Sequence, residues 1–204
     1  MRHGSLSVSE TEKSCAYMKE EFMSKIIPGT NIEYGDRKDA FSVLRPMIEI
    51  TGGLSLGQIC RITGLQASTI QNWVKRGFVP RPEHKKYYER HLSRILLISA
   101  LRDSMNIEDI GELMTLINGD ADDESDDIIS ETDLYDAFCR AVRDLDDHSL
   151  NIDDIEKRIE EIQVNADRSV NDRVIKALKV MVYAYLSGRC IKMINTHLDE
   201  LRGK

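Results

Sequence analysis

Two short helices joined by a tight turn are the pattern that most constrains this chain. Ser55 is a good N-cap for a helix over residues 56–63, and Gly64 supplies the positive φ that a tight turn requires. A second helix is expected from residue 67 or 68 to about residue 76. The apolar residues spaced to pack one helix on the other are Ile59, Ile62, Leu65, Ile70 and Val74. The sequence therefore predicts a helix-turn-helix.

Positive charge is concentrated in residues 54–103, which include this pattern. The segment holds nine lysine and arginine residues against three acidic ones, a formal charge of +6, although the whole chain carries -7. The rest of the chain therefore carries -13. Such segregation is what phosphate binding requires of a protein that otherwise repels DNA. We expect double-stranded DNA to be the partner of this segment.

The second helix of the pattern is expected to expose polar side chains opposite its packing face. A helix set in this way can lie in the major groove, where Gln and Asn pair with adenine and Lys or Arg meets guanine or phosphate. The expected contacts on this helix are Ser68, Thr69, Gln71, Asn72, Lys75 and Arg76. Trp73 is expected to be a core anchor, because its spacing from Ile70 points it inward.

A basic segment follows the second helix. Residues 81–88 carry three basic residues and two tyrosines, and we expect a small β-hairpin wing that contacts the phosphate backbone. The residues expected to make those contacts are Arg81, Lys85, Lys86 and, through its hydroxyl, an otherwise inward-packed Tyr87. His84 and His91 are expected to be ordinary surface histidines rather than a pH switch.

Several of these residues occur in an order and spacing that point to a known family. They are Thr69-Ile70, Trp73, Gly77-Phe78-Val79, Lys85-Lys86-Tyr87, Leu92, Arg94-Ile95 and the helix start from Asn106 to Ile110. The stretch from about residue 54 to 117 resembles a MerR-like winged helix-turn-helix. Residues 70–77 and 117–119, with the acidic stretch that follows, look like a bacterial family described only as a domain of unknown function. The resemblance implies a winged fold and leaves the target open.

The chain departs from MerR-like regulators at two places. Gln71 stands where those regulators carry an Arg that contacts the DNA backbone, which weakens one phosphate contact and makes base reading by Gln71 an alternative. Their long dimerisation helix follows directly after the fourth helix, whereas here an acidic linker and two more helices intervene. The dimer geometry of that family is therefore not expected here, and its metal-binding cysteines have no counterpart.

Helical patterns account for most of the remaining chain. A helix capped by Ser7 or Ser9 is expected to run to Ile26, and another is expected over residues 39–50, where Pro46 requires an early start or a kink. Three further starts carry an acidic residue three positions after the capping residue, a variant of the capping box. These caps are Asn106, Ser130 and Asn151, and the helices predicted from them cover residues 107–117, 131–145 and 152–164.

The C-terminal stretch, residues 170–201, has a helical pattern with a break expected at Ser187-Gly188. Its apolar residues cover nearly all faces of the helix, which requires burial between partners. We expect a helical bundle that also forms a homodimer, and an intrachain core alone is the alternative. An effector pocket is a further alternative, although core packing is expected for the residues concerned. Those residues are Met181, Tyr183, Tyr185 and Cys190.

The acidic stretch from Asp120 to Asp127 is expected to be a solvated linker. A calcium-binding EF-hand loop is the sharper interpretation, but Ser125 stands where such a loop needs Gly. The acidic residues at its ligand positions are Asp120, Asp122, Glu124 and Glu131. A third interpretation makes this anionic stretch an internal mimic that competes with DNA for the basic face. No metal site is expected.

Other functional classes have little support in the sequence. The four cysteines are far apart and are expected to be free, mostly buried thiols. The N-terminus lacks an apolar signal core, and the longest apolar run, residues 180–186, is short of the roughly 20 residues that span a bilayer. We therefore expect a cytoplasmic protein without membrane contact. Catalytic motifs and glycine-rich phosphate loops are absent from the sequence, so neither enzyme activity nor a cofactor is expected.

The predicted fold is mainly all-α, with a winged helix-turn-helix that has a small β wing, and a C-terminal helical bundle. The expected units are a helical N-terminal lead-in (1–53), the MerR-like domain (54–118), an acidic linker (119–130) and a helical oligomerisation domain (131–204). The expected function is that of a dimeric, sequence-specific DNA-binding transcriptional regulator. The alternative is a protein-protein interaction module built on the same winged helix-turn-helix, without DNA binding.

Overall fold

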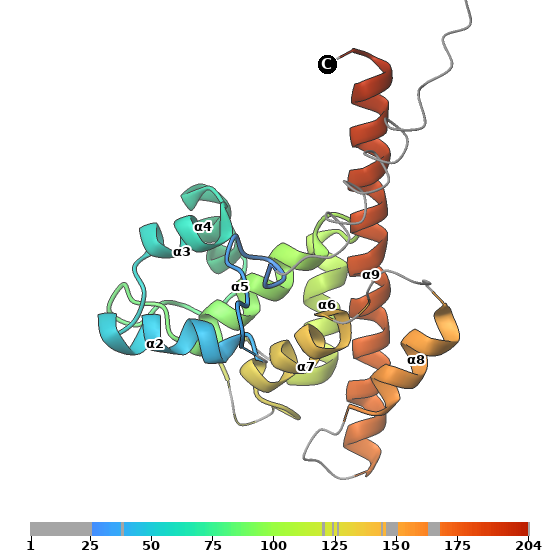
Figure 1. Ribbon diagram of the computed structural model, residues 1–204. Helices are drawn as coiled ribbons and strands as arrows, with labels where there is room; N and C mark the ends of the chain where they lie inside the picture. Colours follow the sequence, from blue (N-terminus) through green and yellow to red (C-terminus); the bar gives the residue numbers. More distant parts are fainter. Residues whose placement is uncertain are drawn as a thin grey trace, which may run out of the picture.

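The computed structural model describes residues 26–37, 39–119, 121–123, 125, 127–143, 145, 151–162 and 168–203. These residues are mainly helical, as predicted (Figure 1). The helices are α2 (Phe41–Thr51), α3 (Leu56–Thr63), α4 (Ala67–Lys75), α5 (Glu89–Leu101), α6 (Ile107–Asn118), α7 (Glu131–Arg143), α8 (Ile152–Glu160) and α9 (Arg168–Leu201). The predicted helix from Ser7 or Ser9 to Ile26 lies outside the described residues, apart from its last residue.

The predicted capping residues start the helices as expected, with one change of partner. The Asn106 side chain accepts a hydrogen bond from the Asp109 N–H at 2.8 Å, and Ser130 Oγ accepts one from the Asp133 N–H at 3.0 Å. Asn151 instead bonds the N–H of Asp153, two positions on, at 3.1 Å. Each cap satisfies an amide group that a helix start leaves without an intrahelical partner. The start points of α6, α7 and α8 are therefore set by local sequence.

Helix α2 continues past Pro46, which lies inside it. Proline has no N–H, so the carbonyl of Ser42, four residues earlier, loses its usual helical partner. That carbonyl instead lies 3.5 Å from a guanidinium nitrogen of Arg37. The helix ends at Gly52, whose φ of 57° lets its N–H bond back to the last turn.

Helix α5 is the centre of the core, and the apolar periodicity of the sequence did not predict it as a separate element. It packs against α3, α6, α7 and α9. Every residue from His91 to Ile98 is buried, and so are Ala100 and Leu101. A helix buried on all sides has no polar face and therefore gives no amphipathic signal. Figure 1 shows α5 running from below the helix-turn-helix towards α9.

A buried ion pair joins α5 to α7. The guanidinium of Arg94 bonds the carboxylate of Glu131, and the two side chains are only 2% and 1% exposed. Arg94 Nε also donates to the carbonyl oxygen of Phe78, just after α4, at 2.9 Å. Burial raises the pKa of Glu131, and the positive charge of Arg94 opposes that rise. One arginine thus connects the helix-turn-helix, the central helix and α7.

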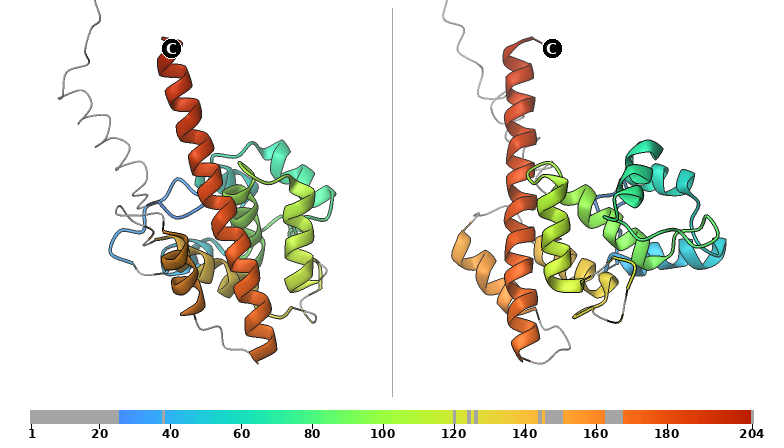
Figure 2. Two further views of the ribbon diagram at one scale, coloured as in Figure 1. Left: turned by 90° about the vertical axis from the view of Figure 1, so that its right-hand side faces the viewer. Right: turned by 180° about the vertical axis from the view of Figure 1, so that it is seen from behind.

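The C-terminal helices form the other side of the molecule. Helix α9 is unbroken over 34 residues and packs against α5, α6, α7 and α8, so the predicted break at Ser187-Gly188 is wrong. Gly188 instead allows a close approach, because a Cβ there would lie 3.1 Å from Cβ of Asp103. The hydroxyl of Ser104, which follows Asp103 in the chain, donates a hydrogen bond to the Ala184 carbonyl oxygen at 2.6 Å. Past this point α9 extends beyond the other helices (Figure 2).

The predicted environments of four C-terminal residues are only partly correct. Met181 is fully buried, as expected of core packing, whereas Tyr183 and Tyr185 are half-buried and Cys190 is exposed. Almost all the buried hydrophobic residues of the described chain belong to one cluster, which includes residues from Ile27 to Ala184. The proposed division into a domain of residues 54–118 and one of residues 131–204 stays a prediction. Within the described residues, no helix is long and apolar enough to cross a membrane.

The Arg94–Glu131 pair generates a stability prediction. Replacing either partner alone, by Arg94→Met or Glu131→Leu, leaves one uncompensated buried charge, so we expect the free energy of unfolding to fall by about 3–5 kcal/mol. The double variant should recover much of that loss because neither charge remains. Urea unfolding followed by far-UV circular dichroism measures this. The exposed pair Arg202–Asp199 is the control, and Arg202→Met there should cost less than about 1 kcal/mol. Wild-type stability in either single buried variant would contradict this role.

Candidate nucleic-acid interface

Helices α3 and α4 form a helix-turn-helix at one corner of the molecule (Figure 1). Ser55 caps α3 with the capping box that Gln58 completes, and Gly64 ends the helix with a φ of 70°. The Asn31 N–H donates to the Ile62 carbonyl at 2.8 Å, which ties the segment before α2 to this turn. The bounds of both helices agree with the prediction. The predicted roles of Ser55 as the helix cap and of Gly64 as the turn residue are confirmed.

The inner face of α4 is apolar and its outer face is polar. Ile70 and Trp73 are buried, so the prediction that Trp73 anchors the core is confirmed. The outer face consists of exposed side chains at spacings of three and four residues, namely Ser68, Gln71, Asn72 and Lys75. No hydrogen bond or ion pair joins these four side chains to any other described residue. Thr69 lies at the edge of this face and is half-buried. The polar face of α4 is therefore open to a partner.

Arg76 belongs to a cluster at the end of α4. Its guanidinium forms an ion pair with Glu108 of α6 and lies 4.7 Å from the ring centre of Phe78. The hydrogen bond from Arg76 lowers the pKa of Glu108. Close packing supports the cluster, because Gly111 leaves room for the Phe78 ring where a Cβ would come within 2.6 Å. Arg76 thus has an internal partner, Glu108, that no local sequence pattern indicated.

The predicted β-hairpin wing is reduced to a tight turn. In the described part of the chain, residues 81–88 contribute only isolated bridges, between Glu83 and Lys86 and between Leu54 and Tyr87, and no regular strand is present. Glu83 and Lys86 exchange two backbone hydrogen bonds of 3.0 and 2.7 Å. His84 and Lys85 between them have φ values of 47° and 65°, as in the tight turns that favour positive φ. The segment reverses direction as a wing does, without forming a sheet.

The basic and aromatic residues of the turn differ in whether their side chains are free to contact a partner. Lys85 at its tip is exposed, and the side chain of Arg81 is exposed as well. Lys86 Nζ donates to the carbonyl oxygens of Thr51 and Gly53 at 3.1 and 3.0 Å, so it caps the end of α2. Tyr87 is 4% exposed, and burial raises the pKa of its hydroxyl. Lys86 and Tyr87 thus have internal contacts that the sequence did not indicate, and their expected phosphate contacts stay a prediction.

His91 is buried, which corrects the expectation of a surface histidine. Its Nδ1 accepts a hydrogen bond from the Tyr88 N–H at 3.1 Å, and its Nε2 lies 2.9 Å from the carbonyl oxygen of Arg81. A neutral imidazole with its proton on Nε2 satisfies both contacts. His91 therefore stabilises the turn by bonding the backbone at both of its ends, Arg81 and Tyr88. His84 is exposed, as predicted.

Acidic residues from outside residues 54–103 contact the basic segment. Glu108 and Glu131 neutralise Arg76 and Arg94 as ion pairs. The acidic stretch adds hydrogen bonds that involve the backbone, since the carbonyl oxygen of Asp123 accepts one from Arg90 at 3.0 Å. An Asp122 carboxylate oxygen accepts one from the Arg81 N–H at 3.2 Å. The described part of the acidic stretch thus lies against the base of the turn. The mimic interpretation stays a prediction, since these contacts leave the outer face of α4 uncovered.

The calcium interpretation of the acidic stretch is weakened by Glu131. Its carboxylate is buried against Arg94 rather than turned towards a loop. Two of the other ligand positions, Asp120 and Glu124, lie outside the described residues. Among the residues that are described, no group of three or more His, Cys, Asp or Glu side chains is placed to hold a metal ion.

One exposed basic residue of the helix-turn-helix, Arg61, lies within the basic segment of residues 54–103 but was not predicted to contact DNA. Arg61 lies in the last turn of α3 and is exposed, and no described residue bonds its side chain. Its position just before the Gly64 turn was the available signal, because a basic residue there extends the charge of the module beyond α4. Within residues 54–88, Arg61, Lys75, Arg81 and Lys85 are the exposed basic residues whose side chains have no acidic partner among the described residues.

Comparison with known proteins relates this region to an uncharacterised family. Residues 54–138 match the family model described as a domain of unknown function (DUF1836), a span that runs from just before α3 into α7. The uncharacterised protein YkrK of Bacillus subtilis (strain 168) is 32% identical over 99 residues. The aligned part is 47% of this chain and 42% of YkrK, so less than half of that relative is covered. No solved structure matches. The expected resemblance to a family of unknown function is thus confirmed for this region.

The two adjacent lysines of the turn generate a prediction. Lys86→Ala removes the donor that caps α2, so we expect the free energy of unfolding to fall by roughly 0.5–1.5 kcal/mol. Lys85→Ala removes an exposed side chain without a bond and should leave stability within about 0.5 kcal/mol of wild type. Paired urea titrations measure both. Equal stability of the two variants would refute the structural assignment of Lys86.

Proposed function

We propose that the protein is a cytoplasmic, sequence-specific DNA-binding transcriptional regulator without enzyme activity. The observation that carries this proposal is the outer face of α4. It presents two carboxamides, a hydroxyl and an ammonium group to solvent, and none of them is bonded to another described residue (Ser68, Gln71, Asn72 and Lys75). A solvent-exposed helix with this face suits the major groove, where base edges offer a distinct pattern of donors and acceptors.

The chemistry of each group suggests its role. The carboxamides of Gln71 and Asn72 each supply a donor and an acceptor, which match the N7 and N6 atoms of adenine. Lys75, one turn further on, matches guanine or a phosphate. The first amides of α4 also favour a phosphate, because Gln66 makes no side-chain cap there. The proposed order along α4 is therefore phosphate, base edges, then a basic anchor.

The tight turn supplies the flanking contacts in this proposal. Lys85 and the guanidinium of Arg81 are exposed and are assigned to phosphates, as is Arg61 of α3. Arg76 is shared with Glu108, so it contributes less positive charge than a free arginine. Lys86 and Tyr87 are assigned to supporting the turn instead. The MerR-like character of the module is part of this proposal and rests on the arrangement of α3, α4 and the turn.

We also propose that the regulator acts as a homodimer through α9. The part of α9 that extends beyond the body carries exposed apolar side chains at spacings of three, four and three residues. They are Ile191, Ile194, Leu198 and Leu201, with exposed fractions of 40%, 57%, 39% and 84%. This is the spacing of a coiled-coil seam. Two modules related by a twofold axis would read a palindrome.

The DNA proposal is tested by substitutions on α4. We expect Gln71→Ala and Asn72→Ala to weaken binding to the preferred site by about 1–3 kcal/mol each and to relax its sequence preference. Lys75→Ala should weaken binding to all sequences and reduce the slope of log affinity against log salt by about one. Selection from random duplex DNA at two salt concentrations, followed by titration of the selected site, measures these effects.

Lys157→Ala is the matched control, because Lys157 is an exposed lysine on α8, outside the helix-turn-helix. It should change neither the selected sequence nor the salt slope. The assignment of α4 would be refuted if the triple variant of Gln71, Asn72 and Lys75 bound the same site as tightly as wild type.

The dimer proposal is tested on the exposed part of α9. We expect the double variant Ile194→Lys and Leu198→Lys to be monomeric at concentrations where wild type is dimeric, since like charges in a seam repel and apolar burial is lost. Sedimentation velocity measures the change. Ile50→Lys is the control, because Ile50 is 86% exposed on α2 and far from α9 in the chain. A wild-type monomer at high concentration would contradict the proposal.

A second candidate function is a protein-interaction module without DNA binding. The observation in its favour is the internal neutralisation of Arg76 by Glu108 and of Arg94 by Glu131, which reduces the positive charge presented by the basic segment. Salt distinguishes the two functions. DNA affinity should fall steeply as salt rises, by a slope of about 0.9 per phosphate neutralised, whereas no retention on DNA at low salt would favour the interaction module.

A further inference from the structure

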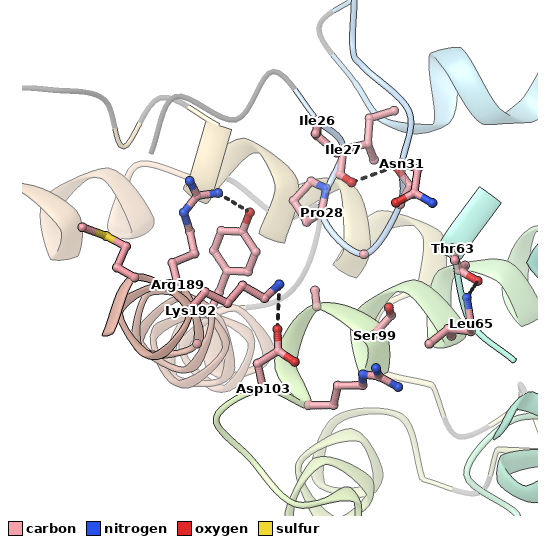
Figure 3. Close-up of a pocket in the computed structure, with 18 residues that line it drawn as sticks. Ile26, Ile27, Pro28, Asn31, Thr63, Leu65, Ser99, Asp103, Arg189 and Lys192 are labelled. Carbon is pink, nitrogen blue, oxygen red and sulfur yellow. Dashed lines mark hydrogen bonds and ion pairs between the residues drawn. The ribbon is translucent and has the colours of Figure 1, made fainter. Parts of the chain in front are cut away.

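Asp103 and Ser104, in the connection between α5 and α6, form a corner that holds α9 at successive turns. The Ser104 hydroxyl donates to the Ala184 carbonyl oxygen at 2.6 Å, and the Asp103 carboxylate forms an ion pair with Lys192 Nζ at 2.8 Å. Between these two bonds, a Cβ on Gly188 would lie 3.1 Å from Cβ of Asp103. Positions 184, 188 and 192 are spaced by four and therefore lie on one face of α9. Figure 3 shows the ion pair as a dashed line from Lys192 to Asp103.

Gly188 is the residue that makes this close approach possible. Two carbon atoms pack best at about 3.5–4.0 Å, so any larger residue at position 188 would push α9 away from the corner. Glycine inside a helix lowers its stability relative to alanine. Here it lies within an unbroken helix of 34 residues, and the approach of Asp103 supplies a physical reason for it.

The corner is where the side-chain bonds between α9 and the other helices end. Beyond Lys192, the hydrogen bonds and ion pairs of the described side chains join residues of α9 to one another or to Arg202 just after it. This part of α9 extends beyond the other helices (Figure 2) and carries the exposed apolar residues from Ile191 to Leu201. The direction in which it leaves the molecule is therefore determined at the corner.

A small rotation at the corner becomes a large displacement at the end of α9. A helix rises about 1.5 Å per residue, so Leu201 lies roughly 20 Å beyond Gly188. A tilt of about 10° moves Leu201 by roughly 3.4 Å, which is about the rise of one base pair. The corner directly follows α5, which packs against α3 and bonds the Phe78 carbonyl through Arg94. It thus lies between the helix proposed to read DNA and the helix proposed to dimerise.

We propose that Asp103, Ser104 and Gly188 set the spacing between the two half-sites that the dimer reads on double-stranded DNA. In a twofold dimer, this spacing follows from the placement of each reading helix relative to the dimer seam. The three residues act through α9 and touch no DNA, so they are positioning residues. The proposal rests on the proposed DNA binding and on the proposed dimer through α9.

The test is selection from duplexes in which the spacer between half-sites varies in length. Deforming DNA to fit a wrong spacer costs energy, so wild type should prefer its own spacer by roughly tenfold over one that differs by a base pair. Gly188→Leu places a side chain between α9 and the corner, and we expect the preferred spacer to shift by about one or two base pairs. The double variant Asp103→Ala and Ser104→Ala removes both bonds, and it should reduce the spacer preference to about twofold.

The matched control is the double variant Thr196→Ala and Asp199→Ala, which removes a hydroxyl and a carboxylate from α9 beyond the corner. It should keep the wild-type spacer. Thermal unfolding and sedimentation velocity check that each variant is a folded dimer. A merely structural role of the corner would weaken binding equally at every spacer length. An unchanged spacer preference in the folded corner variants would therefore overturn the proposal.

Failure of the proposed function gives a different result. A wild type that selects no duplex, or a single half-site without a fixed spacer, would refute DNA binding by a dimer. Small-angle X-ray scattering, which needs no DNA, then decides the role of the corner by itself. Gly188→Leu should change the scattering curve of the protein, because α9 leaves the corner at a different angle. A curve identical to that of wild type would rule out this role.

Discussion

The arrangement of the described helices depends on the bonds that the buried guanidinium of Arg94 makes. It lies in the middle of the chain's core and bonds both Glu131 of α7 and the Phe78 carbonyl that follows α4. A charge that is 2% exposed is tolerable only with such partners, because removal from water costs several kcal/mol. The requirement therefore restricts how α4, α5 and α7 can be placed. The family match of residues 54–138 contains all three residues, which makes α7 a structural part of the matched region.

Internal pairing also decides which charges of the basic segment remain for a partner. The formal charge of +6 over residues 54–103 is partly offset by Glu108 and Glu131, which pair with Arg76 and Arg94. The polar face of α4 is different, because its side chains lie opposite the buried Ile70 and Trp73 and form no hydrogen bond or ion pair with another described residue. The geometry of α4, more than the net charge, supports the proposed DNA interface.

Helix α9 serves different purposes along its length. Its first half is core, with Val174, Leu178 and Met181 fully buried. Its middle approaches the end of α5 at Gly188, where Arg189 and Lys192 are among the residues that line a cavity of about 450 Å³. Its last turns carry the exposed apolar stripe. The near-uniform apolar pattern seen in the sequence is therefore the sum of these environments, which explains why a single role for the helix could not be assigned from it.

Local sequence was sufficient to determine α3, α4, the Gly64 turn, the caps of α6 and α7 and the inward position of Trp73. In each case the deciding hydrogen bond or packing repeat spans about three or four residues, so the chain carries the signal within one helical turn. The outer face of α4 followed from the same periodicity. The tertiary structure alone decided that Lys86 caps α2, that Tyr87 and His91 are buried, and that Arg94 pairs with Glu131. These contacts join residues 10 to 37 positions apart, and the cavity joins segments still further apart. No local pattern encodes them, because they depend on how finished helices pack.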